Sequence, residues 1–123
     1  VDVSEDAIAT AREFNKNLSN VHFKQMDLLK EFPENNFDFI SMCEIGYYFT
    51  SEELENLFKK VENNLIKNGQ FLMVHWTSYV REYPLTGRQV HKLFKELNQE
   101  KLQFKPVSSF VHESYELFLW EKI

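Results

Sequence analysis

Apolar residues recur along this chain at two different spacings, and the alternation between them predicts helices and strands in turn. Val1–Val3 looks like the end of a strand, and Ser4 is suited to cap the helix that we expect from Glu5 to about Asn17. The apolar positions of that helix recur every three to four residues, at Ala7, Ile8, Ala11, Phe14 and Leu18. We expect these side chains to face a core.

The same change of spacing continues along the middle of the chain. Val21–Gln25 and Phe37–Cys43 are predicted strands, separated by the turn-forming run Pro33–Asn36, and the second is apolar enough to be a buried central strand. Thr50 and Glu53 form a capping box that opens a helix. The helix has one apolar face, made of Leu54, Leu57, Phe58, Val61 and Leu65, and Asn68–Gly69 is expected to end that region.

The C-terminal third predicts a strand, a helix and a hairpin. Gln70–His75 is the strand, and Thr86 with Gln89 forms a second capping box. The helix that follows turns Val90, Leu93, Phe94 and Leu97 inward. Two final strands, about Leu102–Val107 and Tyr115–Lys122, have no helix-length connection, so they should pair antiparallel.

This order of elements predicts one α/β domain over residues 1–123. The sheet should be open and mostly parallel, edged by a C-terminal antiparallel hairpin. Folds of this kind bind nucleotide-like ligands at the carboxyl ends of their strands. We therefore look for functional residues at Asp2, Asp27, Glu44 and His75, where predicted strands end.

The composition of the chain narrows the range of partners that we expect it to bind. The net charge of −5 argues against a nucleic-acid backbone as partner. No apolar run reaches the roughly 18 residues that a membrane span needs, and a single cysteine fits the cytoplasm. His22 and His112 lack ligand-spaced neighbours, so no metal is expected, and Cys43 is expected to be a core residue.

Four blocks carry a resemblance to a known family: VDVSEDAIATARE, VHFKQMDLLKEFP, FDFISMCEIGYYFT and NNLIKNGQFLMVHW. In this order they resemble class I S-adenosylmethionine-dependent methyltransferases, which have a Rossmann-like fold. The C-terminal blocks HWTSYVREYPLTGRQVHKLF and HESYELFLWEK resemble the nodulation protein S-like branch, which includes enzymes that methylate an amino sugar on a chitooligosaccharide. The resemblance implies S-adenosylmethionine as cofactor and a small-molecule acceptor, such as an amino sugar or oligosaccharide.

The chain departs from the family at its first motif, a strand followed by a glycine-rich loop. Its three glycines, Gly46, Gly69 and Gly87, do not form such a loop. We expect that this first strand and loop are missing, and that the strand belongs between those ending at Asp2 and Cys43. The segment alone is then expected to be inactive.

The cofactor residues are expected at the first two strand ends. A carboxylate at Asp2, beside Val3, suits the two ribose hydroxyls, although Asp2 can instead cap the following helix. Asp27 suits the exocyclic amine of adenine, Leu28 offers a backbone N–H and an apolar wall, and Met26 can pack on the ring. The alternative for Asp27 is an ordinary turn residue.

The methyl acceptor is expected at the later strand ends. Glu44 lies where donor and acceptor should meet, so we expect it to contact the cofactor as well, and its carboxylate suits an incoming ammonium as an orienting group or base. His75 is a second candidate base. The alternatives are a Glu44 that caps the next turn and a His75 that only ends its strand.

Aromatic side chains near these acids suit a cation or a sugar ring. Tyr47, Tyr48 and Trp76 are the candidates, with ordinary packing as the alternative. Tyr83 lies in a predicted lid over residues 81–85. His91, on the next helix, either points into the site or is solvated.

Two other functions stay open on the sequence. A NAD-dependent oxidoreductase also places an acid after its second strand, but the closing hairpin and the Asp27 block argue against it. A non-catalytic binding module would keep the fold without the glycine-rich loop. The sequence does not indicate an oligomeric state.

Overall fold

The computed structural model describes all 123 residues, which form two compact units, Val1–Pro33 and Glu34–Ile123. The first unit contains one helix, α1 (Glu5–Phe14), and one isolated parallel bridge between Asp2 and Gln25. Ser4 caps α1 as predicted, because its side chain accepts a hydrogen bond from the Ala7 amide.

Two expectations for the first unit are wrong. Neither Val1–Val3 nor Val21–Gln25 is a strand, since their only ladder contact is the isolated bridge between Asp2 and Gln25. In α1, Ile8 is buried, but Phe14 is 85% exposed and Leu18 is half exposed. The physical reason is that this unit has no sheet for the apolar face of the helix to cover.

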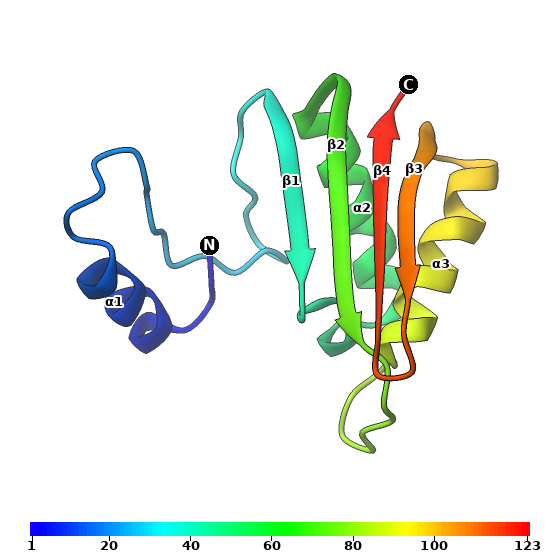
Figure 1. Cartoon of the computed structure of the whole chain (residues 1–123), viewed down its shortest axis with the longest axis horizontal. Helices are drawn as coiled ribbons and strands as arrows, with labels where there is room; N and C mark the ends of the chain where they lie inside the picture. Colours follow the sequence, from blue (N-terminus) through cyan, green and yellow to red (C-terminus); the bar gives the residue numbers. More distant parts are fainter. The chain divides into compact units, whose positions relative to one another are not determined.

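The second unit is a four-stranded mixed sheet with two helices on one side (Figure 1). Its strands are β1 (Phe37–Cys43), β2 (Leu65–Trp76), β3 (Phe104–Val111) and β4 (Tyr115–Lys122), in the order β1-β2-β4-β3. β1 and β2 are parallel, whereas β4 pairs antiparallel with both β2 and β3. The predicted α/β fold and its closing hairpin are confirmed, but the sheet is mixed instead of mostly parallel, because only the β1–β2 pairing is parallel.

The helices α2 (Ser51–Asn64) and α3 (Gly87–Glu100) begin where the sequence predicts. Both capping boxes are present in full, with reciprocal bonds between Thr50 and Glu53 and between Thr86 and Gln89. The helices bury one apolar face each against the sheet. An aromatic core fills the layer between them, with edge-to-face or tilted ring contacts among Phe58, Phe71, Phe94, Phe104 and Trp120.

Three further details of this unit differ from expectation. β1 is an edge strand, so only Met42 of its seven residues is buried, and Cys43 is exposed instead of belonging to the core. Leu65 begins β2 instead of completing the face of α2. Asn68–Gly69 lies within β2, where Asn68 has a φ of 62° and the pairing with β1 is irregular.

No helix of this structure is both long enough and apolar enough for a membrane span.

Candidate functional site

Glu44 links the carboxyl ends of the two parallel strands in the second unit. Its Oε1 accepts a hydrogen bond from the Trp76 amide at 2.9 Å, and its Oε2 accepts one from the Tyr47 hydroxyl at 2.6 Å. The backbone of Glu44 is left-handed, with a φ of 58°. Such a conformation costs a non-glycine residue about 1 kcal/mol or more and is typical of functional sites. The residue remains exposed, so its carboxylate has room for a further donor.

Three tyrosines gather beside this carboxylate and form what we call the tyrosine cluster, Tyr47, Tyr48 and Tyr83. The Tyr47 and Tyr83 rings stack at 5.2 Å with an interplanar angle of 2°, and Tyr48 meets both edge-on. The Tyr48 and Tyr83 hydroxyls lie 3.2 Å apart. Burial and the hydrogen bond to Glu44 raise the pKa of Tyr47, so its phenol stays protonated and donates to the carboxylate.

The cluster is built from two segments that are distant in sequence. Tyr47 and Tyr48 belong to the short 3₁₀ turn η1 (Gly46–Tyr48), which begins three residues after the end of β1. Tyr83 comes from the connection between β2 and α3, and the Leu85 amide there bonds the Tyr47 carbonyl at 3.3 Å. The structure thus brings the predicted lid segment against the tyrosines, while its opening and closing stay a prediction.

His75 lies beneath this turn, with no exposed surface. Its Nε2 accepts a hydrogen bond from the Gly46 amide at 3.0 Å, and its Nδ1 lies 3.3 Å from Nε2 of His91. Burial lowers the pKa of His75 to about 4. Burial, and then the neighbouring His75 and Lys95, lower the pKa of His91 to about 3, while the Glu116 backbone acts in the opposite direction. Both rings are therefore neutral at pH 7.

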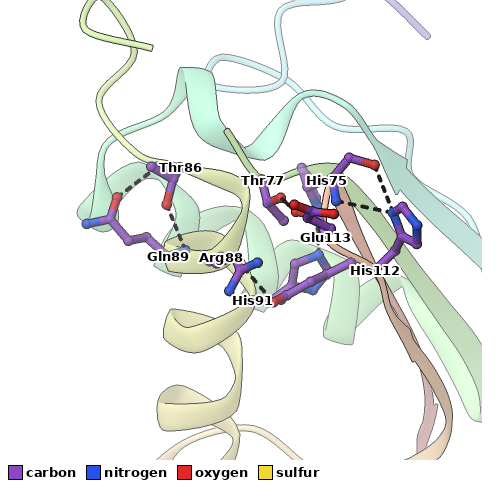
Figure 2. Close-up of polar contacts among 10 residues, drawn as sticks. His75, Thr77, Thr86, Arg88, Gln89, His91, His112 and Glu113 are labelled. Carbon is purple, nitrogen blue, oxygen red and sulfur yellow. Dashed lines mark hydrogen bonds and ion pairs between the residues drawn. The ribbon is translucent and has the colours of Figure 1, made fainter. Parts of the chain in front are cut away.

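Trp76 follows His75 and points to the other face of the sheet. Its side chain is 42% exposed, and its cross-strand partner is Tyr115. The next residue, Thr77, ties this strand end to the β3–β4 hairpin (Figure 2) through bonds to the carbonyls of Ser114 and Glu113. Trp76 is thus available for stacking, at a strand end that Thr77 ties to the hairpin.

The cofactor candidates lie in the first unit, on neighbouring extended segments. The Asp2–Gln25 bridge, with the Met26 amide bonding the Asp2 carbonyl at 2.8 Å, places Asp2 and Asp27 after adjacent parallel segments. Asp2 also accepts from the Ser4 amide at 2.8 Å and stays exposed. This pair of carboxylates fits a neutral nucleoside, which offers hydroxyl and amine donors.

The other cofactor candidates fit less directly. Asp27 accepts from the Leu29 amide at 3.0 Å and lies 3.2 Å from the Lys30 ammonium, so it also acts as a turn residue. Met26 is buried, Leu28 is half-buried and Val3 is exposed. All five cofactor candidates therefore lie in the first unit, but Met26 is buried and does not expose a face on which an adenine ring could pack.

Two groups that matter to the site were not singled out from the sequence. A Cβ on Gly46 would lie 2.7 Å from both His75 Nε2 and Val90 Cγ1, and one on Gly87 would lie 2.1 Å from the Trp76 carbonyl oxygen. Both glycines thus permit close approach of the chain to the end of β2. The scarcity of glycine in this chain was the available signal. The contact of His91 with His75 was also missed, and the expectation of a solvated His91 is wrong because its side chain is 1% exposed.

No group of three or more histidine, cysteine, aspartate or glutamate side chains is arranged to hold a metal ion.

Comparison with known proteins gives one family. A family model described as a methyltransferase domain matches residues 1–118. The comparison with curated proteins yields no significant match.

Solved structures with the same fold include three instructive examples. N-methyltransferase NodS from Bradyrhizobium japonicum WM9, in complex with S-adenosyl-L-homocysteine, has a TM-score of 0.81 and 17% identity, covering 98% of this chain and 64% of NodS. A protein from Pseudomonas syringae assigned as a methyltransferase has a TM-score of 0.77, 24% identity, and coverages of 98% and 70%. The PH0226 protein from Pyrococcus horikoshii OT3 has a TM-score of 0.76, 24% identity, and coverages of 98% and 69%. The chain thus spans about two thirds of these proteins, and the likeness is one of fold.

Proposed function

Because the chain belongs to the methyltransferase domain family, we propose that it serves in the transfer of a methyl group from S-adenosylmethionine to the amine of a small acceptor. Family membership makes it an S-adenosylmethionine-dependent methyltransferase domain, whereas the acceptor is our proposal. We further propose that the acceptor is an amino sugar or an oligosaccharide that carries one. Supporting this choice are the N-methyltransferase NodS among proteins of the same fold and the chemistry at Glu44.

The observation that carries the proposal is the carboxylate of Glu44 among aromatic side chains at the ends of two parallel strands. An amine reaches the protein as an ammonium, which the carboxylate and the exposed face of Tyr48 both attract. The amine must lose its proton before it attacks. We propose that Glu44 accepts that proton, while Tyr47 donates a hydrogen bond to Oε2 and so orients the carboxylate. Trp76 offers a stacking surface for a sugar ring.

The cofactor supplies an electrophilic methyl group on a sulfonium. We propose that Asp2 receives the ribose hydroxyls, because it is exposed and follows one of two paired segments. Asp27, with Leu28, follows the other segment and is proposed to receive the adenine amine. Val3 and Met26 are assigned only to the wall of this site. Since the sulfonium is already reactive, positioning and exclusion of water supply most of the protein's contribution.

The geometry suggests a different role for His75 than that of a base. Its Nε2 is occupied by the Gly46 amide and its ring is buried, so we propose that it positions the turn that carries Tyr47. Glu44 is then the single proposed catalytic residue.

The experiment is a methyl-transfer assay on the full-length protein with radiolabelled S-adenosylmethionine. Two chitooligosaccharides that differ only at one terminal amine, one free and one N-acetylated, are the matched acceptors. We expect label on the free amine alone. Label on both acceptors, or on neither while other amines are methylated, would refute the sugar assignment. Thermal shifts with S-adenosylhomocysteine and with NAD test the cofactor class, and stabilisation by NAD alone would refute it.

A further inference from the structure

Two buried histidines meet behind the proposed acceptor site. His75 is the penultimate residue of β2, and His91 lies in the second turn of α3, which begins at the capping pair Thr86 and Gln89 (Figure 2). Their side chains are 0% and 1% exposed, and their rings lie edge-to-face at 5.0 Å. A pair of buried imidazoles needs a consistent set of hydrogen bonds, because an unpaired polar atom in the core is costly.

The hydrogen bonds around the pair allow one arrangement of protons. The Gly46 amide can only donate, so Nε2 of His75 is the acceptor and a neutral His75 carries its proton on Nδ1. That N–H points to Nε2 of His91 at 3.3 Å, which must then be an acceptor as well. His91 therefore carries its own proton on Nδ1, an atom that makes no hydrogen bond of standard geometry.

This arrangement connects α3 to the proposed acceptor site. The Gly46 amide begins the turn η1, and the next two residues are Tyr47 and Tyr48 of the tyrosine cluster. Tyr47 in turn holds the carboxylate of Glu44. Whatever fixes the His75 tautomer therefore also fixes the turn that carries the proposed substrate contacts.

We infer that His91 is a positioning residue that selects the Nδ1-protonated tautomer of His75 and, through it, anchors the turn Gly46–Tyr48. Only the role of the turn in contacting the acceptor rests on the proposed function. The His75 tautomer and the anchoring of the turn are properties of the protein without ligands. His91 is thereby assigned to support of the site from behind instead of contact with the acceptor.

Other titratable and charged groups lie around the pair, and each belongs to an element packed against it. Glu116 of β4 is the cross-strand partner of His75 and lies 4.0 Å from Arg88 of α3. Lys95 of α3 acts on His91 through its charge, and the Tyr47 ring of η1 contacts His75. Glu44 accepts a hydrogen bond from the Tyr47 hydroxyl. None of these groups accepts the Nδ1–H of His75, so that role falls to His91.

The test uses two substitutions of similar size at one position. In His91→Gln the amide oxygen can take the place of the Nε2 acceptor, whereas His91→Leu has no acceptor. Nitrogen-15 NMR of the imidazoles reports the His75 tautomer, and hydrogen exchange reports protection of the Gly46 amide. We expect Nδ1-protonated His75 in the wild type and in His91→Gln. In His91→Leu the Gly46 amide should exchange at least ten times faster.

The result that would overturn the inference is a wild-type His75 protonated on Nε2, or equal protection of Gly46 in the Gln and Leu variants. If His91→Leu fails to fold, the wild-type tautomer and the His91→Gln spectrum still decide the matter. Neither readout requires a cofactor or an acceptor. Failure of the methyl-transfer assay would therefore not affect the conclusion about His91, and failure of the NMR and exchange test would not affect the proposed methyl transfer.

Discussion

Acidification should destabilise this protein well before its carboxylates titrate, because of the two buried histidines. The folded-state pKa is about 4 for His75 and about 3 for His91, against an ordinary value of 6.5. A depressed pKa in the folded state means that the unfolded chain binds protons first. The stability that the two neutral rings confer is therefore complete above about pH 6.5 and is lost as the pH falls toward 4 and 3.

The size of the effect follows from these values. Between pH 7 and pH 5 each histidine takes up most of one proton in the unfolded chain and almost none in the folded one. With about 1.4 kcal/mol per pKa unit, each contributes a loss of about 2 kcal/mol, or about 4 kcal/mol for the pair. This is a large part of the stability of an ordinary domain.

The assay is urea unfolding at pH 7 and pH 5, followed by tryptophan fluorescence. His91→Gln, which removes one buried titrating ring, should reduce the pH-dependent loss to about half. The exposed His22 provides the control, and His22→Gln should retain the full loss. A wild-type stability that changes by less than about 1 kcal/mol between the two pH values would show that the two histidines do not have such depressed pKa values in the folded state.

Three further predictions test the site. Gly46→Ala should lower the free energy of unfolding by about 3 kcal/mol in chemical denaturation, because its Cβ would lie 2.7 Å from His75 Nε2 and from Val90 Cγ1. Adding Val90→Ala should recover part of this loss. If the losses of the two single variants simply add in the double variant, the steric clash with Val90 is contradicted. Glu44→Gln should lower kcat at least tenfold and leave the calorimetric affinity for S-adenosylhomocysteine nearly unchanged; wild-type kcat would show that Glu44 only closes its turn. Asp2→Ala should weaken cofactor binding by about 1–3 kcal/mol, about 5- to 150-fold in Kd. Asp2→Asn keeps an acceptor for the Ser4 amide, so it separates a loss of local structure from a loss of cofactor contacts. Equal cofactor affinities for the wild type and both variants would show that Asp2 does not belong to the site.

Local signals predicted the second unit well. The capping boxes at Thr50 and Thr86 fixed the starts of α2 and α3, because a cap depends on residues three positions apart and on little else. β4 has the predicted bounds, and its pairing with β3 follows from the short connection between them. Fold class and family were therefore accessible from the sequence.

Burial was predicted less well, since it depends on what lies beside an element. Phe37–Cys43 has the composition of a central strand, but at the edge of this sheet it exposes most of its side chains. Phe14 has helical spacing and no surface to cover. In the site, the end of a predicted strand identified Glu44, but its bond to the Trp76 amide joins residues 32 positions apart, so no local pattern predicted that bond. The contact between His75 and His91 was not predicted either, because the two residues meet only when α3 folds back on β2.

The most direct test of the account is a crystal structure of the full-length protein with S-adenosylhomocysteine bound. We predict that the ribose hydroxyls lie at the Asp2 carboxylate and that the adenine amine lies at Asp27. A nucleoside bound away from both aspartates would contradict this prediction.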